Sequence, residues 1–176
     1  LSVNKSPKQF RDNGNTVAAW FAYLQTLGLP GNSLTIEITE GLLLNAVADV
    51  TDKLQLLREG GVQIAIDDFG TGYSSLSYLK RFHIDYLKID QSFVRDIETD
   101  ANNRALSNAI IVMAHALGLK VIAEGVETAG QLNLLKEAGC DFAQGYYFSR
   151  PITADAFEVW LLANTRKPDR QAREAG

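Results

Sequence analysis

Short apolar runs alternate with helical patterns along nearly the whole chain. Residues 34–39 alternate apolar and polar side chains as a strand does, whereas residues 16–27 carry their apolar side chains on one helical face. Glycine follows several of the helical patterns, where a helix is expected to end. The pattern therefore predicts repeated units, each made of one strand followed by one helix.

The predicted elements repeat in the order strand, helix, six times. Strands are predicted at residues 1–4, 34–39, 62–66, 86–89, 120–123 and 141–145. Helices are predicted at residues 16–27, 46–59, 74–81, 103–117, 128–138 and 154–163, and the polar residues 166–176 are expected to form a disordered tail. Such units imply parallel strands with right-handed crossovers.

Parallel strands joined by helices form either a closed barrel or an open doubly wound sheet. The sequence contains neither a Gly-x-Gly-x-x-Gly turn nor a Gly-Lys-Ser/Thr phosphate loop, which disfavours the nucleotide-binding open sheets. A complete eight-unit barrel usually takes about 250 residues, and this chain has 176. The expected fold class is α/β, a TIM-like (β/α)8 barrel of which about six βα units are present.

Composition and charge narrow the class of protein. The chain is 46% hydrophobic, as a soluble globular domain is, and it contains no apolar run long enough to cross a membrane and no signal peptide. A net charge of -4 disfavours a nucleic-acid polymer as partner. Cys140 is the only cysteine, so an internal disulfide is excluded. We expect a cytoplasmic domain, whose parent protein can still be anchored in a membrane.

Two adjacent carboxylates, Asp67 and Asp68, end the apolar run at residues 62–66. Neighbouring negative charges destabilise each other unless a cation or several donors lie between them, so the pair indicates a divalent-metal site. Gly70 and Gly72 follow, and they permit tight turns close to a ligand. The alternative is that one of the two aspartates caps the following helix.

Polar side chains fall at or near the carboxyl end of every predicted strand. In a parallel barrel these ends form one mouth, where active sites lie. Asparagine, glutamate and aspartate oxygens suit magnesium or manganese, whereas two distant histidines, His83 and His115, and one cysteine do not make a zinc site. Both histidines are expected to be structural or solvated. The strand-end residues are Asn4, Glu37, Asp67, Asp68, Lys88, Glu124 and Gln144.

Four carboxylates and a lysine at one mouth have the composition that two-metal phosphodiester hydrolysis requires. The ions would lower the pKa of a bound water and neutralise the phosphate, and Lys88 would add positive charge in the transition state. The alternative for Lys88 is a structural pair with Asp90. Glu124 ends its strand directly and is the better site candidate, while Glu127 could instead fix the loop before the next helix.

Six motifs, in this order and over nearly the whole chain, closely resemble those of the cyclic-di-GMP phosphodiesterases of the EAL type. They are Val-Asn-Lys-Ser (3–6), Glu-Ile-Thr-Glu (37–40), Asp-Asp-Phe-Gly-Thr-Gly-Tyr-Ser-Ser-Leu (67–76), Leu-Lys-Ile-Asp (87–90), Ala-Glu-Gly-Val-Glu (123–127) and Gln-Gly-Tyr-Tyr-Phe-Ser-Arg-Pro (144–151).

The resemblance implies a barrel with one antiparallel strand, two Mg²⁺ or Mn²⁺ ions, and hydrolysis of cyclic di-GMP to linear pGpG in bacterial signalling. It also implies that Ca²⁺ inhibits turnover while permitting binding. A homodimer is expected from the same resemblance, as are flanking sensor or diguanylate cyclase domains in the parent protein.

The resemblance also implies roles for single residues. Asn4, Glu37 and Asp67 resemble the ligands of one ion, with Asp67 shared and Asp68 serving the second ion. The remaining roles fall on three residues: Lys88 resembles the lysine that contacts the nucleophilic water and the phosphate, Glu124 the glutamate proposed as general base or metal ligand, and Gln144 a substrate-binding glutamine.

A loop between the metal site and the dimer interface is implied as well. The segment comprising Phe69, Gly70, Thr71, Gly72, Tyr73, Ser74 and Ser75 resembles the loop that couples the metal site to dimerisation. Glu127 resembles the glutamate that steadies this loop.

The sequence departs from the family pattern at one point, because it lacks the Glu-Ala-Leu motif that names the family. In the family that motif lies on a strand before the Asn4 strand, so residues 1–165 are expected to be an N-terminally incomplete domain. A metal-ligand glutamate and a phosphate-contacting arginine would then be missing, and this chain alone is expected to be poorly active or inactive. The alternative functions are a catalytically inactive cyclic-di-GMP receptor and a dimerising regulatory domain.

Overall fold

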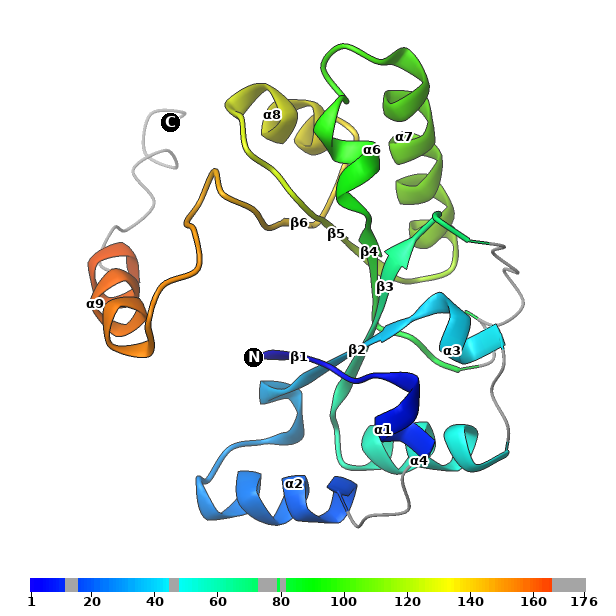
Figure 1. Cartoon of the computed structure of the whole chain (residues 1–176), viewed down its shortest axis with the longest axis vertical. Helices are drawn as coiled ribbons and strands as arrows, with labels where there is room; N and C mark the ends of the chain where they lie inside the picture. Colours follow the sequence, from blue (N-terminus) through cyan, green and yellow to red (C-terminus); the bar gives the residue numbers. More distant parts are fainter. Residues whose placement is uncertain (12–15, 45–47, 73–78, 80–81, 166–176) are drawn as a thin grey trace, which may run out of the picture.

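The computed structural model describes residues 1–11, 16–44, 48–72, 79 and 82–165. Its strands form one six-stranded parallel sheet, in which each strand pairs with the next along the chain. The sheet curves into a half-barrel with helices along its convex side (Figure 1). The strands are β1 Ser2–Asn4, β2 Thr35–Thr39, β3 Gln63–Phe69, β4 Tyr86–Ile89, β5 Lys120–Ala123 and β6 Phe142–Ala143.

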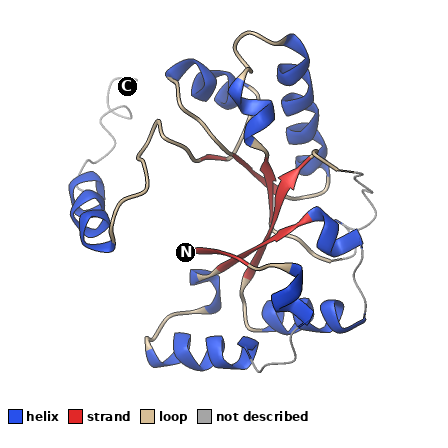
Figure 2. Ribbon diagram, in the orientation of Figure 1, coloured by secondary structure: helices blue, strands red, loops and turns tan. Residues whose placement is uncertain are grey.

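Helices connect consecutive strands, as right-handed crossovers between parallel strands require, and Figure 2 shows this alternation. The described helices are α1 Pro7–Arg11, α2 Thr16–Thr26, α3 Glu40–Leu44, α4 Ala48–Glu59, α6 Gln91–Arg95, α7 Ala101–Ala116, α8 Ala129–Glu137 and α9 Ala154–Thr165, with a short 3-10 helix at Gly31–Ser33. The predicted α/β class and the partial barrel are both confirmed.

The hydrophobic core lies between the sheet and the helices on its convex side. Its strand residues share a register, so that Ile36 lies beside Ile64 and Ile66 lies beside Leu87. Successive side chains of a strand point to opposite faces. Glu37, which lies between two buried isoleucines of β2, therefore points to the other, concave face of the sheet. Lys88 does the same on β4.

Three short helices were not predicted from the sequence. α1, α3 and α6 each have five residues, which is too short for the 3.6-residue periodicity to show. The single helix predicted at residues 46–59 corresponds to α4, with α3 as a separate element before it. The predicted helix at 74–81 and the predicted tail at 166–176 lie outside the described residues, apart from Leu79 and its burial in the core.

Strand β3 extends three residues beyond its predicted end at Ile66, and it includes both aspartates. The alternative interpretation, in which an aspartate at this position caps a helix, is therefore wrong. The antiparallel strand that the family resemblance implies is not among the six described strands, all of which are parallel.

The last helix, α9, stands apart from the other helices across the concave side of the sheet (Figure 1). Its large apolar side chains are exposed, and they include Phe157, Val159, Trp160, Leu161 and Leu162. Within the described ranges, none of the helices combines the length and the hydrophobicity that a membrane crossing needs.

Candidate metal centre

Lys88 lies at the centre of the acidic residues on the concave face. Its Nζ atom is 2.6 Å from Glu37 Oε2, 2.8 Å from Asp67 Oδ1 and 2.5 Å from Glu124 Oε1. The lysine is only 3% exposed, so its charge depends on these three partners from β2, β3 and the end of β5. Burial lowers the pKa of Lys88, but the hydrogen bonds to Asp67, Glu124 and Glu37 outweigh burial and raise it above its ordinary value.

Lys88 does not form the structural pair with Asp90 that was the alternative to a role in the site. Lys88 instead bonds three carboxylates from neighbouring parts of the sheet. Asp90 caps α6, because its side chain accepts a 3.0 Å hydrogen bond from the backbone N–H of Ser92.

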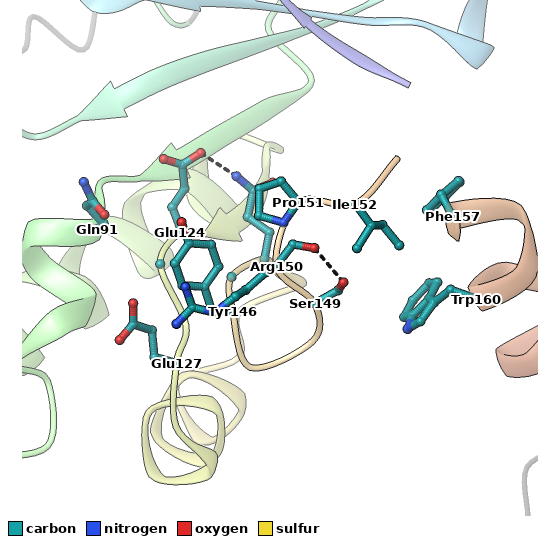
Figure 3. A pocket seen from close by; sticks show the side chains of 13 residues that line it. Gln91, Glu124, Glu127, Tyr146, Ser149, Arg150, Pro151, Ile152, Phe157 and Trp160 are labelled. Carbon is teal, nitrogen blue, oxygen red and sulfur yellow. Dashed lines mark hydrogen bonds between the residues drawn. The ribbon is translucent and has the colours of Figure 1, made fainter. Parts of the chain in front are cut away.

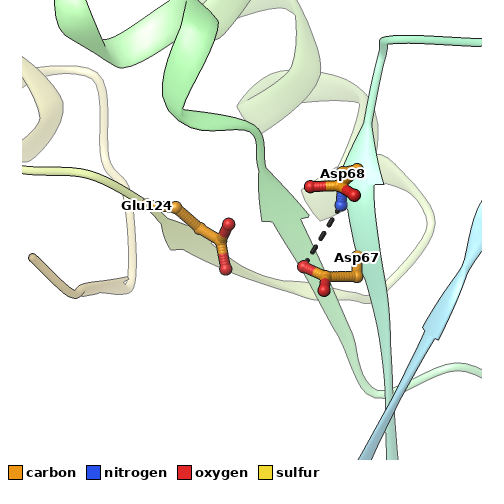
Figure 4. Close-up of side chains that lie close together, drawn as sticks. All are labelled: Asp67, Asp68 and Glu124. Atoms are coloured by element: carbon orange, nitrogen blue, oxygen red, sulfur yellow. Dashed lines mark hydrogen bonds between the residues drawn. The ribbon is translucent and has the colours of Figure 1, made fainter. Parts of the chain in front are cut away.

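Asp67, Asp68 and Glu124 form the acidic cluster, in which one carboxylate oxygen from each residue lies within 4.8 Å of the others (Figure 4). Burial raises the pKa of Asp68, and the charges of Asp67 and Asp90 raise it further. Burial also raises the pKa of Glu124, against the opposing effect of Lys88. Burial is thus the largest cause of both shifts, and the charges of neighbouring carboxylates add to it.

The donor chemistry of this cluster fits a hard divalent cation. Together with Glu37 there are four carboxylates and one ammonium group, so negative charge remains in excess when all are ionised. Carboxylate oxygens are the ligands that Mg²⁺ and Mn²⁺ prefer. The cluster therefore has both the charge and the atoms to hold a divalent ion.

A bulge in β3 allows two consecutive aspartates to reach the same site. In a regular strand adjacent side chains point to opposite faces, so only one of them could join the cluster. The register between β3 and β4 shifts between Ile66 and Phe69, and Asp68 takes a left-handed backbone conformation with φ of 53°. A bulge re-aims a side chain in this way, and such backbone strain often lies at functional sites.

Gln144 lies beside the cluster at the end of β6. Its Nε2 atom donates a 2.9 Å hydrogen bond to Glu124 Oε1, and its backbone N–H donates to Ala123 O, also at 2.9 Å. The Gln144 amide and the Lys88 ammonium group therefore hold the same oxygen of Glu124, Oε1.

A pocket of about 650 Å³ opens next to Glu124 and Gln144. Figure 3 shows Glu124, Glu127, Tyr146 and Arg150 toward one end of it, and Phe157 and Trp160 of α9 toward the other. The Arg150 guanidinium stacks 4.6 Å from the centre of the Tyr146 ring. The pocket thus joins acidic, cationic and aromatic groups.

The remaining predicted residues take different places. Asn4 is exposed at the end of β1, where it lies beside Glu37 in the strand register. Of the predicted coupling loop, the structure describes Phe69, Gly70, Thr71 and Gly72, while Tyr73, Ser74 and Ser75 lie outside the described residues. The side chain of Glu127 is exposed and lines the pocket.

Glu40 lies close to the loop after β3, and sequence reasoning did not single it out. Both of its carboxylate oxygens are buried, and among the described residues neither has a hydrogen-bond partner. A Cβ atom at Gly72 would lie 3.5 Å from Glu40 Oε2, so this carboxylate lies against the loop after β3. Its spacing of three residues from Glu37, at the start of a helix, was the available signal. Gln91, Tyr146 and Arg150 were also missed as pocket residues.

The fold and the site together define an α/β-barrel protein with a candidate metal centre at the carboxyl ends of its strands. The chain belongs to the EAL domain family, whose model matches residues 1–151. It is 48% identical over 140 residues to the cyclic di-GMP phosphodiesterase NbdA of Pseudomonas aeruginosa, a match that covers 80% of this chain and 18% of NbdA. The chain spans about a fifth of the length of the curated relatives it matches.

Solved structures agree with this assignment. The EAL domain of Mycobacterium smegmatis DcpA matches with a TM-score of 0.84 and 39% identity, over 96% of this chain and 74% of that one. Klebsiella pneumoniae BlrP1 matches with a TM-score of 0.78 and 36% identity, over 86% of this chain and 38% of that one. BlrP1 has been solved as a manganese and as a calcium complex with cyclic di-GMP.

Proposed function

We propose that this chain is the larger part of a metal-dependent phosphodiesterase domain that hydrolyses cyclic di-GMP to linear pGpG. The observation that carries the proposal is the acidic cluster of Asp67, Asp68 and Glu124, with Lys88 bonded to two of its members. The relative NbdA is a cyclic di-GMP phosphodiesterase, and BlrP1 binds cyclic di-GMP with manganese. NbdA supports cyclic di-GMP as the substrate, and BlrP1 supports cyclic di-GMP as a ligand and manganese as the ion.

The residues that would hold two Mg²⁺ or Mn²⁺ ions are Asn4, Glu37, Asp67, Asp68 and Glu124. Asp67 lies on β3, which pairs with β2 on one side and with β4 on the other. It therefore lies between Glu37 of β2 and Glu124 after β5, and we propose that both ions share it. When bound, the ions would neutralise phosphate charge and favour ionisation of a water molecule.

The chain's own side chains would donate hydrogen bonds, accept the proton and bind the substrate. Lys88, whose pKa is raised by its acidic partners, stays protonated. All three of its N–H groups have carboxylate partners here, so it would donate to the attacking water or to a phosphate oxygen once a bound ion takes over one of those carboxylates. Glu124, whose pKa is raised mainly by burial, is suited to accept the proton of the attacking water. Gln144 fixes the Glu124 carboxylate, and the pocket beside it would receive part of the dinucleotide.

Two alternatives from other functional classes lead to different measurements. A cyclic-di-GMP receptor would bind the dinucleotide without cleaving it. A dimerising regulatory domain would act on an attached sensor or cyclase domain and would not bind the dinucleotide at all. The longer curated relatives are compatible with such flanking domains, and a homodimer is part of our proposal.

The test is turnover of cyclic di-GMP in Mg²⁺ and in Mn²⁺, measured as pGpG by chromatography. Two proteins are compared: this chain, and the same chain joined at its amino end to a Glu-Ala-Leu segment. We expect the extended protein to be active and this chain to be poorly active. Glu124→Gln keeps the shape of the side chain but removes the base, so it should lower turnover at least about a thousandfold.

Binding of the dinucleotide separates the alternatives. In Ca²⁺ we expect the extended protein to bind cyclic di-GMP without turnover. Binding without cleavage in all three metals would replace the enzyme by the receptor. No binding in any metal would favour the regulatory domain.

A further inference from the structure

Helix α6 lies between the two loops that carry the acidic cluster. Gly70, in the loop after β3, has φ of 96°, and a Cβ there would be 3.0 Å from the ring of Phe93. Gly125, in the loop after β5, has φ of 69°, and a Cβ there would be 2.7 Å from Gln91 Cβ. The loop after β3 and the loop after β5 therefore both pack closely against α6.

Gln131, on α8, connects the Glu124 loop to the far end of α6. The side chain is buried, with 5% of its surface exposed. Its Oε1 atom accepts hydrogen bonds from the backbone N–H groups of Glu127 at 2.7 Å and Thr128 at 3.0 Å. Its Nε2 atom donates a 2.9 Å hydrogen bond to Arg95 O, the last residue of α6.

These bonds have two separate functions in the fold. The bond from the Gln131 N–H to Thr128 Oγ1 and the bond from the Thr128 N–H to Gln131 Oε1 form a capping box, which stabilises the start of α8. A capping box needs only an acceptor at this position, and glutamate serves as well as glutamine. The donor bond to Arg95 O adds nothing to the cap, and it joins two elements that follow different strands.

We propose that Gln131 is a positioning residue, which holds Glu124 against Asp67 and Asp68 by tying the loop at residues 124–127 to α6. The loop begins at Glu124, whose N–H bonds Ile89 O at 3.1 Å, and it ends at the Glu127 N–H that Gln131 holds. Both ends are therefore fixed, one to β4 and the other through Gln131 to α6. This inference rests on the proposed metal-dependent function.

We call the hydrogen bond from Gln131 Nε2 to Arg95 O the tether. The variant Gln131→Glu removes the tether and keeps the capping box. A carboxylate still accepts from both N–H groups, but it cannot donate to Arg95 O and is repelled by that oxygen. Gln25→Glu is the matched control, because Gln25 is exposed on α2 and receives the same change of charge. Gln131→Met removes the tether without adding a charge, at the expense of the cap.

Three quantities are measured on each variant of the chain: the thermal unfolding midpoint, the affinity for Mn²⁺ by calorimetry, and amide hydrogen exchange at residues 125–127. For Gln131→Glu we expect a midpoint below that of the Gln25→Glu control, because the Arg95 carbonyl loses its partner and faces a buried carboxylate. We also expect Mn²⁺ affinity about tenfold weaker and faster exchange, neither of which the control should show. Gln131→Met should show the same loss of affinity together with a lower midpoint. Unchanged affinity and exchange in Gln131→Glu would overturn the proposal.

Failure of the metal site itself gives a different result. If neither this chain nor the protein extended with the Glu-Ala-Leu segment binds Mn²⁺, the proposed function loses its cofactor, and hydrogen exchange alone then decides about the tether. Faster exchange at residues 125–127 in Gln131→Glu supports it, and exchange equal to that of the Gln25→Glu control rejects it.

Discussion

Aspartates lie at both ends of the sheet, but their surroundings differ. At the amino ends of the strands, Asp85 Oδ2 accepts a 2.8 Å hydrogen bond from the Ile64 N–H, and Asp141 Oδ2 accepts one of 2.8 Å from the Val121 N–H. Asp141 also pairs with His115 at 2.8 Å. At the carboxyl ends, Asp67 and Asp68 lie with Glu124 in a cluster whose only buried cation is Lys88, among the described residues.

The difference shows what each end of the sheet is built for. Each amino-end aspartate joins one strand to the next by satisfying a backbone N–H group, which contributes to folding. The four carboxyl-end carboxylates outnumber the one ammonium group among them, so they weaken the fold unless a further cation joins them. The same residue type is therefore structural at one end and available to a ligand at the other, as expected for a parallel barrel.

Among the variants that test the difference between the two ends of the sheet, Lys88→Met is expected to have the largest effect. The change keeps most of the side-chain volume but leaves Glu37, Asp67 and Glu124 without their buried cation. Removing one partner of a buried charge network costs about 3 to 5 kcal/mol. We expect the free energy of unfolding in EDTA, measured by urea denaturation, to fall by that amount.

Manganese provides the control for this variant. Because a bound divalent ion can replace part of the lost positive charge, saturating Mn²⁺ should stabilise Lys88→Met more than it stabilises the unaltered chain. Equal stabilisation of the two proteins would mean that Lys88 and the ion do not share the same carboxylates. That result would contradict the placement of the metal centre.

The order of elements could be predicted from the sequence because strands and long helices have a period. The alternation in residues 34–39 and the one-sided pattern of residues 16–27 correspond to β2 and α2. Helices of five residues show no period, so α1, α3 and α6 were missed. Of these three unpredicted helices, α6 matters most for the candidate site, because it lies between the loop after β3 and the loop after β5.

The sequence predicted which residues form the candidate site, but it did not predict how they are arranged. Polar residues at strand ends selected Asp67, Asp68, Lys88 and Glu124, which the structure brings together. The bulge that lets adjacent aspartates share one face depends on the register between β3 and β4, and no local pattern encodes that register. Gln131 was predictable only as part of a helix, because its partner at Arg95 is distant in sequence.

A smaller effect is expected from Asp85→Ala at the amino end of β4. The change removes the acceptor of the Ile64 N–H, and Ile64 is buried in β3. A buried donor without a partner costs about 1 to 3 kcal/mol, so the free energy of unfolding should fall by that amount. Asp85→Asn keeps an acceptor oxygen and should lose much less. Unchanged Mn²⁺ affinity in both variants is expected, and a parallel loss of affinity would contradict the separation of the two ends.

The smallest effect concerns Asp141 and is visible only as a dependence on pH. Burial alone would raise the pKa of Asp141, but hydrogen bonds with His115 and the Val121 N–H outweigh burial and hold it below its ordinary value. The unfolded chain therefore binds this proton more readily than the folded one. The stabilisation is complete above the unfolded-state pKa of about 3.9 and is lost as the pH falls through the lower folded-state value.

Thermal unfolding of the unaltered chain and of Asp141→Asn between about pH 5 and pH 2 measures this contribution. The pair with His115 is partly exposed, so the difference in stability at pH 5 should be less than about 1 kcal/mol. It should shrink as the pH falls through the folded-state pKa, below which the carboxylate is protonated in both states. A difference that grows as the pH falls would mean that Asp141 is strained in the folded chain, and the amino end would then resemble the acidic cluster at the opposite end of the sheet.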